Sequence, residues 1–153
     1  MQPGEVLGVA AQIAVALAGF AGVVVVFRRE AVHAWSGIDK LRLRLLLANS
    51  IVPLGLSMLG LLLLSIKPPE IWRWCSGIAL VASLSFVTAT GKAFRRLYLR
   101  DMQPPRTTRF MFYLFGAFGV AAMFLQLYNI ALLAEFWPFF FTAIVYQIIM
   151  AMA

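Results

Sequence analysis

Side chains that could carry out acid–base, nucleophilic or metal chemistry are scarce in this sequence and lie far apart. His33 is the only histidine and Cys75 the only cysteine among the 153 residues, so no intramolecular disulfide is possible. Catalysis by a side chain needs a base, a nucleophile or a metal site within mutual reach. The sequence has no glycine-rich phosphate loop and no metal-type spacing of His and Cys. We therefore expect no enzyme activity, no cofactor and no bound metal.

Acidic and basic side chains are missing altogether from five long runs, which contain no Asp, Glu, Lys, Arg or His. Glu135 separates the last two of these runs. These runs are Val6–Phe27, Leu45–Ile66, Trp74–Gly91, Phe110–Ala134 and Phe136–Ala153. The whole chain is 63% hydrophobic and 12% charged, whereas soluble domains carry about 25% charged residues. Ionisable residues inside a membrane mark proton relays, coupled transporters and voltage sensors. Their absence argues against a proton-driven pump.

Each run is close to the ~20 apolar residues that a helix needs to cross a bilayer. The runs lack the alternating pattern of a membrane β-barrel, so helices are the solution that satisfies the backbone in lipid. We predict an all-α integral membrane protein, a single domain over residues 1–153 built as a bundle of five transmembrane helices. The helices are expected at about 5–28, 40–66, 71–100, 108–134 and 137–153. The fifth is short, because residues 138–153 make only about 24 Å of helix.

Basic residues gather in two of the segments that connect these runs. Residues 28–44 and 92–109 hold 11 of the 13 Lys and Arg residues. Such an asymmetry is typical of cytoplasmic loops, so the net charge of +7 indicates membrane topology rather than nucleic-acid binding. We expect a cell-membrane protein, in the bacterial inner membrane, with its amino terminus outside and its carboxyl terminus inside after five spans. The expected contacts to anionic lipid are Arg28, Arg29, Lys40, Arg42, Arg44, Lys92, Arg95, Arg96, Arg100, Arg106 and Arg109.

Uncharged polar residues recur at helical spacing and predict the inner face of the bundle. Buried amides in lipid need hydrogen-bond partners, so we expect Gln126 and Asn129 to bond to Asn49 or to hydroxyls of the third helix. A proline inside the second helix leaves a backbone carbonyl without its donor and predicts a kink. The predicted polar face consists of Asn49, Pro53, Ser57, Ser76, Ser83, Thr90, Gln126 and Asn129.

Small residues on two helices predict close helix packing. In the first run Ala10, Ala14, Ala18 and Gly22 recur every four positions, and such faces let helices approach closely in lipid. Gly119 and Ala122 precede the two amides on the fourth helix. These six positions form the predicted packing face.

Local signals predict helix ends and membrane depth. Ser36 and Asp39 have the spacing of a capping box at the start of the second helix. Pro68 and Pro69 should end that helix. Trp35, Trp72 and Trp74 are expected at the level of the lipid headgroups.

Three functions remain open at this point. The first is a small membrane protein that acts by helix–helix assembly, as a homo-oligomer or with a membrane partner, with its basic loops on anionic lipid. The second is a channel or passive transporter with an uncharged lining of Asn49, Ser83, Gln126 and Asn129. The third is a membrane-disrupting effector.

Overall fold

The computed structural model describes residues 2–27, 35–98, 106–131 and 136–152, with side chains for all of these except 38, 94, 97–98 and 106–112. They form five α-helices, so the all-α prediction is confirmed. The helices are α1 (Pro3–Phe27), α2 (Gly37–Ile66), α3 (Ile71–Tyr98), α4 (Arg106–Ala131) and α5 (Trp137–Met152). The described bounds lie within three residues of the expected ones, and the expected ends at residues 28, 100, 134 and 153 lie outside the described residues.

Four of these helices contain a segment long and apolar enough to cross a membrane. Among the described residues the segments are Pro3–Phe27, Asp39–Ile66, Ile71–Ala93 and Tyr113–Ala131. The helix α5 is apolar but has only 16 residues, fewer than the ~20 that a full crossing needs.

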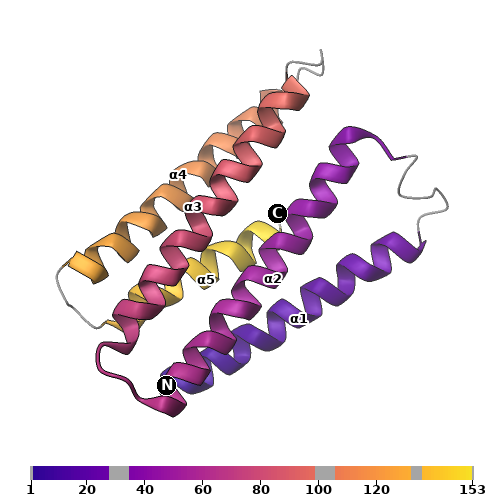
Figure 1. Cartoon of the computed structure of the whole chain (residues 1–153). Helices are drawn as coiled ribbons and strands as arrows, with labels where there is room; N and C mark the ends of the chain where they lie inside the picture. Colours follow the sequence, from indigo (N-terminus) through magenta and orange to yellow (C-terminus); the bar gives the residue numbers. More distant parts are fainter. Residues whose placement is uncertain (1, 28–34, 99–105, 132–135, 153) are drawn as a thin grey trace.

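The short helix α5 nevertheless occupies the centre of the bundle. Figure 1 shows α1 and α2 as one antiparallel hairpin, α3 and α4 as another, and α5 between them. The helix α5 packs against all four other helices. On its inner side Phe140, Ala143, Ile144 and Gln147 are almost fully buried, at the i, i+3, i+4, i+7 spacing of a single helix face.

The core lies towards the end of the bundle that contains the amino terminus and the α2–α3 turn. At that end Gly60 of α2 permits a close approach of three helices: a Cβ atom at this position would lie 2.8 Å from Leu7 of α1 and 3.3 Å from Phe140 of α5. Trp72 of α3 packs on the Phe140 ring, with 6.0 Å between ring centroids. A Cβ atom at position 60 would therefore require the Leu7 side chain to shift and would press on the Phe140 ring.

The hairpins diverge towards the other end of the bundle (Figure 1). Within the described part of α2, the first buried side chain after the helix start is that of Asn49. On α3 the last is that of Ala79 among the described side chains, although the helix continues to Tyr98. The described side chains of α2 and α3 are therefore less buried towards the basic end than at the end that holds the core.

Two of the tryptophans that were expected at headgroup level are buried against other parts of the chain. Trp72 belongs to the core, because α5 covers it, and Trp35 is only 5% exposed. Trp74 is 63% exposed, as an interfacial anchor requires. Cys75, one turn after Trp72 on α3, is fully buried.

The predicted ends of α2 are confirmed. The Ser36 hydroxyl accepts the backbone N–H of Asp39 at 3.1 Å and donates to the Asp39 carboxylate at 2.9 Å. At the other end, the N–H of Lys67 donates to the Leu63 carbonyl at 2.8 Å, and Lys67 adopts a left-handed conformation with φ of 52°. The chain leaves the helix just before Pro68. Pro53 lies within α2, which continues on both sides of it.

Candidate functional site

The amide of Asn129 joins three segments of the chain. Its Nδ2 donates to the Ser76 hydroxyl on α3 at 2.8 Å and lies 3.4 Å from the Trp72 carbonyl. Its Oδ1 accepts the backbone N–H of Phe136, immediately before α5, at 3.1 Å. The sequence-based expectation that Asn129 pairs with a hydroxyl of the third helix is confirmed.

Gln126, one turn earlier on α4, holds the first turn of α5. Its Nε2 donates to the Phe139 carbonyl and to the Thr142 hydroxyl, the latter at 3.2 Å. The Thr142 hydroxyl in turn donates to the Phe139 carbonyl at 2.7 Å. We call Ser76, Gln126, Asn129 and Thr142 the amide junction. Its hydrogen bonds fix where α5 begins, which is a structural role.

A second contact between α4 and α5 lies about two turns further along. The Tyr146 hydroxyl donates to the Phe115 carbonyl at 3.1 Å. The ring lies directly over Gly119, where a Cβ atom would be 2.7 Å from the hydroxyl oxygen and 2.9 Å from Cζ. Gly119 therefore allows Tyr146 to reach the α4 backbone. Ala122 is also buried on this face of α4.

Other buried polar atoms have no partner among the described residues. These atoms are the Oδ1 and Nδ2 of Asn49, the hydroxyl oxygen of Ser57 and the Oε1 of Gln147. The three residues are at most 1% exposed. Asn49 and Ser57 lie on one face of α2 with the buried Pro53, and Gln147 lies on the inner face of α5, which packs against α2. We call Asn49, Ser57 and Gln147 the unpaired polar row.

The predicted polar face is thus divided into separate groups. Ser76, Gln126 and Asn129 meet in the amide junction, whereas Asn49 and Ser57 belong to the unpaired polar row with Pro53. Ser83 and Thr90 are half-buried on α3, beyond the core. The Oε1 of Gln126 also has no partner within the described residues. No hydrogen bond among the described side chains joins Asn49 or Ser83 to Gln126 or Asn129.

The packing face predicted on α1 follows a different spacing from the expected one. Ala10 and Ala14 are buried, but Ala18 is half-buried and Gly22 is exposed. The buried positions are Leu7, Ala10, Ala14 and Ala21, which are separated by steps of three, four and seven. This spacing is typical of a helix that wraps around its neighbour.

Another side of α1 carries three glycines and an amide, and we call it the glycine face. It consists of Gly8, Gln12, Val15, Gly19, Gly22 and Val26, which alternate steps of four and three. All of these except the half-buried Gly8 are exposed. No described atom would come within 4 Å of a Cβ atom built on Gly8, Gly19 or Gly22. Contacts within the described chain therefore do not require glycine at these three positions.

The basic residues lie mainly on the surface. Arg42, Arg44, Lys92, Arg95 and Arg96 are exposed, and Lys40 is half-buried. Arg106 lies in the first turn of α4 and Arg109 in the same helix, but their side chains fall outside the described set. Arg28, Arg29, Arg100 and His33 also lie outside the described residues.

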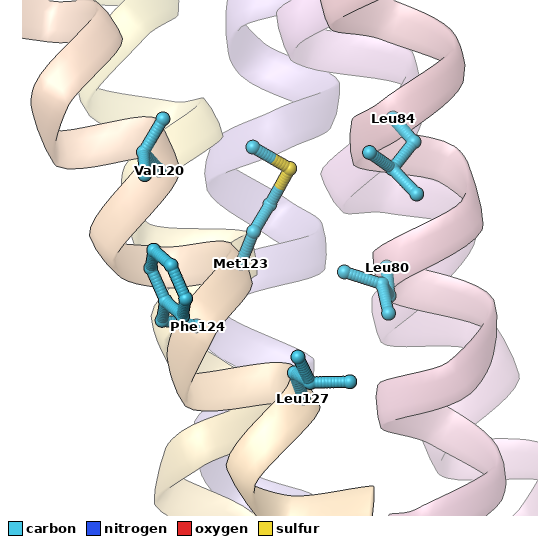
Figure 2. Close-up of a pocket in the computed structure, with 6 residues that line it drawn as sticks. All are labelled: Leu80, Leu84, Val120, Met123, Phe124 and Leu127. Atoms are coloured by element: carbon cyan, nitrogen blue, oxygen red, sulfur yellow. The ribbon is translucent and has the colours of Figure 1, made fainter.

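An apolar groove of about 320 Å³ runs between α3 and α4 on the surface of the bundle. Figure 2 shows its walls, which α3 supplies with two leucines and α4 with four side chains. The lining residues are Leu80, Leu84, Val120, Met123, Phe124 and Leu127. No polar atom contributes to the lining, so the groove suits a hydrocarbon chain.

Comparison with family models, with curated proteins and with solved structures finds no match to this chain. Its function must be inferred from its own geometry.

In the part of the chain that the structure describes, no three His, Cys, Asp or Glu side chains gather into a possible metal site.

Sequence reasoning did not identify the importance of α5. Thr142, Tyr146 and Gln147 all contribute to polar contacts or to the unpaired polar row. A signal was present, since Thr142, Tyr146 and the adjacent Gln147 recur at a spacing of one helical turn. Their partners lie on other helices, and no spacing within one helix could reveal them.

Proposed function

We propose that this chain is a multi-pass protein of the cell membrane that acts by assembly, either with copies of itself or with a membrane partner. The glycine face of α1 is the observation that carries this proposal. Glycine in a helix costs about 1 kcal/mol relative to alanine, and Gly19 and Gly22 have no described neighbour to justify that cost. Small residues at such positions let a second helix approach closely in lipid.

The exposed amide of Gln12 adds a polar group to the same face of α1. Hydrocarbon offers an amide no hydrogen-bond partner, so leaving it exposed to lipid tails is unfavourable. A helix that packs against Gly19 and Gly22 would extend past Gln12, which lies seven residues, or about 10 Å, before Gly19. Amide side chains can form hydrogen bonds across such helix pairs.

The topology that we propose has both basic connectors in the cytoplasm and the amino terminus outside. It rests on the positive charge of the segments around residues 28–44 and 92–109. We propose that α5 also lies within the bilayer, because it packs against all four membrane-length helices. The exposed arginines of α2 and α3 would then face anionic headgroups.

Cysteine crosslinking tests the assembly directly. In a Cys75→Ala background, a cysteine at Gly22 should form a disulfide-linked dimer in native membranes, whereas a cysteine at Gly116 should not. Gly116 is a suitable control because it is also exposed, with open space beside it, but lies on α4. Equal crosslinking at both positions would indicate random collision.

Bulky substitutions provide the complementary test. Gly19→Leu and Gly22→Leu should lower the association constant at least about tenfold, the effect of losing roughly 1.4 kcal/mol of association energy, and should therefore lower the oligomeric fraction. Gly116→Leu should leave that fraction unchanged. Exclusively monomeric wild-type protein, together with no co-purifying membrane partner, would contradict the proposal.

The second candidate is a passive channel or transporter, favoured by the unpaired polar row. A buried polar group without a partner costs about 1–3 kcal/mol, and uncharged polar groups can line a conducting path. Such a path would run between α2 and α5, past Asn49, Ser57 and Gln147, rather than past the amide junction.

Flux through proteoliposomes separates this candidate from assembly alone. Asn49→Leu and Gln147→Leu should abolish permeation of water or a small polar solute, because each removes polar atoms from the proposed path. Thr90→Val, which changes a half-buried hydroxyl outside the row, is the control. Wild-type flux no higher than that of empty liposomes would exclude a conducting path for the solutes tested.

A further inference from the structure

The groove between α3 and α4 leads towards an exposed arginine. Leu84 and Arg95 are eleven residues apart on α3, which is about three helical turns, so the two side chains leave the helix within roughly 20° of each other. Arg95 is exposed, and so is the next residue, Arg96. Arg96, however, leaves the helix about 120° away from the direction of Leu84.

The distance along α3 from Leu84 to Arg95 matches the distance from the middle of a bilayer to its headgroups. Eleven residues correspond to about 16 Å, close to half of the ~30 Å hydrocarbon thickness of a bilayer. If the acyl chain of a lipid occupied the groove beside Leu84, the phosphate of that lipid would lie at the level of Arg95. Arginine binds phosphate strongly because its planar guanidinium can donate two parallel hydrogen bonds.

We propose that the α3–α4 groove is a binding site for one anionic phospholipid, with an acyl chain between Leu84 and Phe124 and the phosphate at Arg95. The inference rests on the proposed membrane location and adds a defined lipid site to it. The groove lining is wholly apolar, so it selects for the hydrocarbon chain. Arg95 selects for negative charge in the headgroup.

Charge also favours a lipid over a second copy of the chain. Copies inserted in the same orientation would bring Arg95, Arg96 and Lys92 of each chain to the same depth, and all three are exposed cations. Like charges at an interface are unfavourable. A phospholipid instead supplies the opposite charge at that depth.

Native mass spectrometry of the purified protein tests the site. The protein is offered an equimolar mixture of phosphatidylglycerol and phosphatidylcholine with identical acyl chains, and the ratio of the two bound lipids is measured. Arg95→Gln should lower the preference for phosphatidylglycerol about fivefold, the effect expected for one arginine at an anionic surface. Arg96→Gln is the matched control, and it should alter the ratio by less than about twofold because this side chain leaves the helix about 120° away from the groove.

A second pair of variants tests the groove itself. Leu84→Trp should fill it and reduce retention of both lipids. Ile78→Trp, at an exposed position on another face of α3, should retain them as the wild type does. Equal effects of Arg95→Gln and Arg96→Gln would overturn the defined site in favour of general surface attraction, as would unchanged lipid binding in Leu84→Trp.

The same spectra separate this inference from the proposed assembly. Oligomers whose lipid ratio is insensitive to Arg95→Gln would refute the lipid site alone. Monomers that show the predicted lipid ratio would refute self-assembly and support the site. Oligomers that bind no lipid until they are dissociated would show that another chain covers the groove, which also overturns the proposal.

Discussion

The Asn129 amide and the Ser76 hydroxyl, 53 positions apart in the sequence, form a buried 2.8 Å hydrogen bond that connects α4 to α3. The other end of the same amide accepts the N–H of Phe136. One side chain thus holds both the α3–α4 contact and the start of α5. Because the Ser76 and Asn129 side chains are buried, each depends on the other for its hydrogen bond.

We predict that Asn129 and Ser76 are energetically coupled. In a double-mutant cycle with Asn129→Ala and Ser76→Ala, unfolding in detergent should give a coupling energy of about 0.6 kcal/mol, the average for hydrogen bonds between membrane helices, and at most about 1.7 kcal/mol. Ser85→Ala, at an exposed hydroxyl on α3, should show no coupling with Asn129→Ala. A coupling energy of zero for Asn129 and Ser76 would contradict the described geometry.

Two glycines on α4 should respond in opposite ways to the same substitution. Gly119→Ala places a methyl group against Tyr146 and should lower the free energy of unfolding by about 1–2 kcal/mol, in the range of overpacking mutations. Gly116→Ala meets open space and should raise it by up to about 1 kcal/mol through helix propensity. Thermal or denaturant unfolding of both variants measures the difference. Similar changes in both would mean that Tyr146 does not pack on Gly119.

The two buried asparagines should also behave differently. Asn129→Leu removes three hydrogen-bond contacts and should destabilise the fold by about 2 kcal/mol. Asn49→Leu removes amide atoms that have no partner in the described chain and should leave stability unchanged or raise it by about 1 kcal/mol. Equal destabilisation by both substitutions would show that Asn49 binds a group such as ordered water.

Membrane topology can be tested with two exposed lysines at opposite ends of the bundle, Lys67 at the α2–α3 turn and Lys92 near the end of α3. With Cys75→Ala as background, Lys67→Cys in the α2–α3 turn should react with an impermeant thiol reagent from outside the cell. Lys92→Cys should react only after the membrane is permeabilised. The reverse pattern would overturn the proposed orientation. Cys75 itself is a poor reporter because it is buried.

The sequence allowed the helices and their ends to be predicted, because these depend on local chemistry. Charge-free runs of membrane length, the Ser36–Asp39 cap and the Pro68–Pro69 stop act within a few residues of one another. The pairing of Asn129 with a third-helix hydroxyl was also predictable, since a buried amide needs a polar partner. The same prediction was wrong for Gln126, whose described partners lie on α5 rather than on α2 or α3.

The central position of α5 could not be predicted in the same way. Its burial arises from contacts with four other helices, and its own pattern is almost uniformly apolar. For the same reason the burial of Trp72 against Phe140 was not predicted. On α1 more than one face carries small residues, so only the packed structure distinguishes the buried row from the glycine face.

The central position of α5 has a consequence for biosynthesis. The ribosome makes α5 after the four helices against which it packs, so the core around Phe140 cannot close until those helices have already left the ribosome. Contacts between distant parts of a chain form late and leave incomplete intermediates exposed. A nascent chain that ends before Trp137 would therefore leave the buried Gln126 amide without its partners Phe139 and Thr142, whereas the partners of Asn129 would already be present.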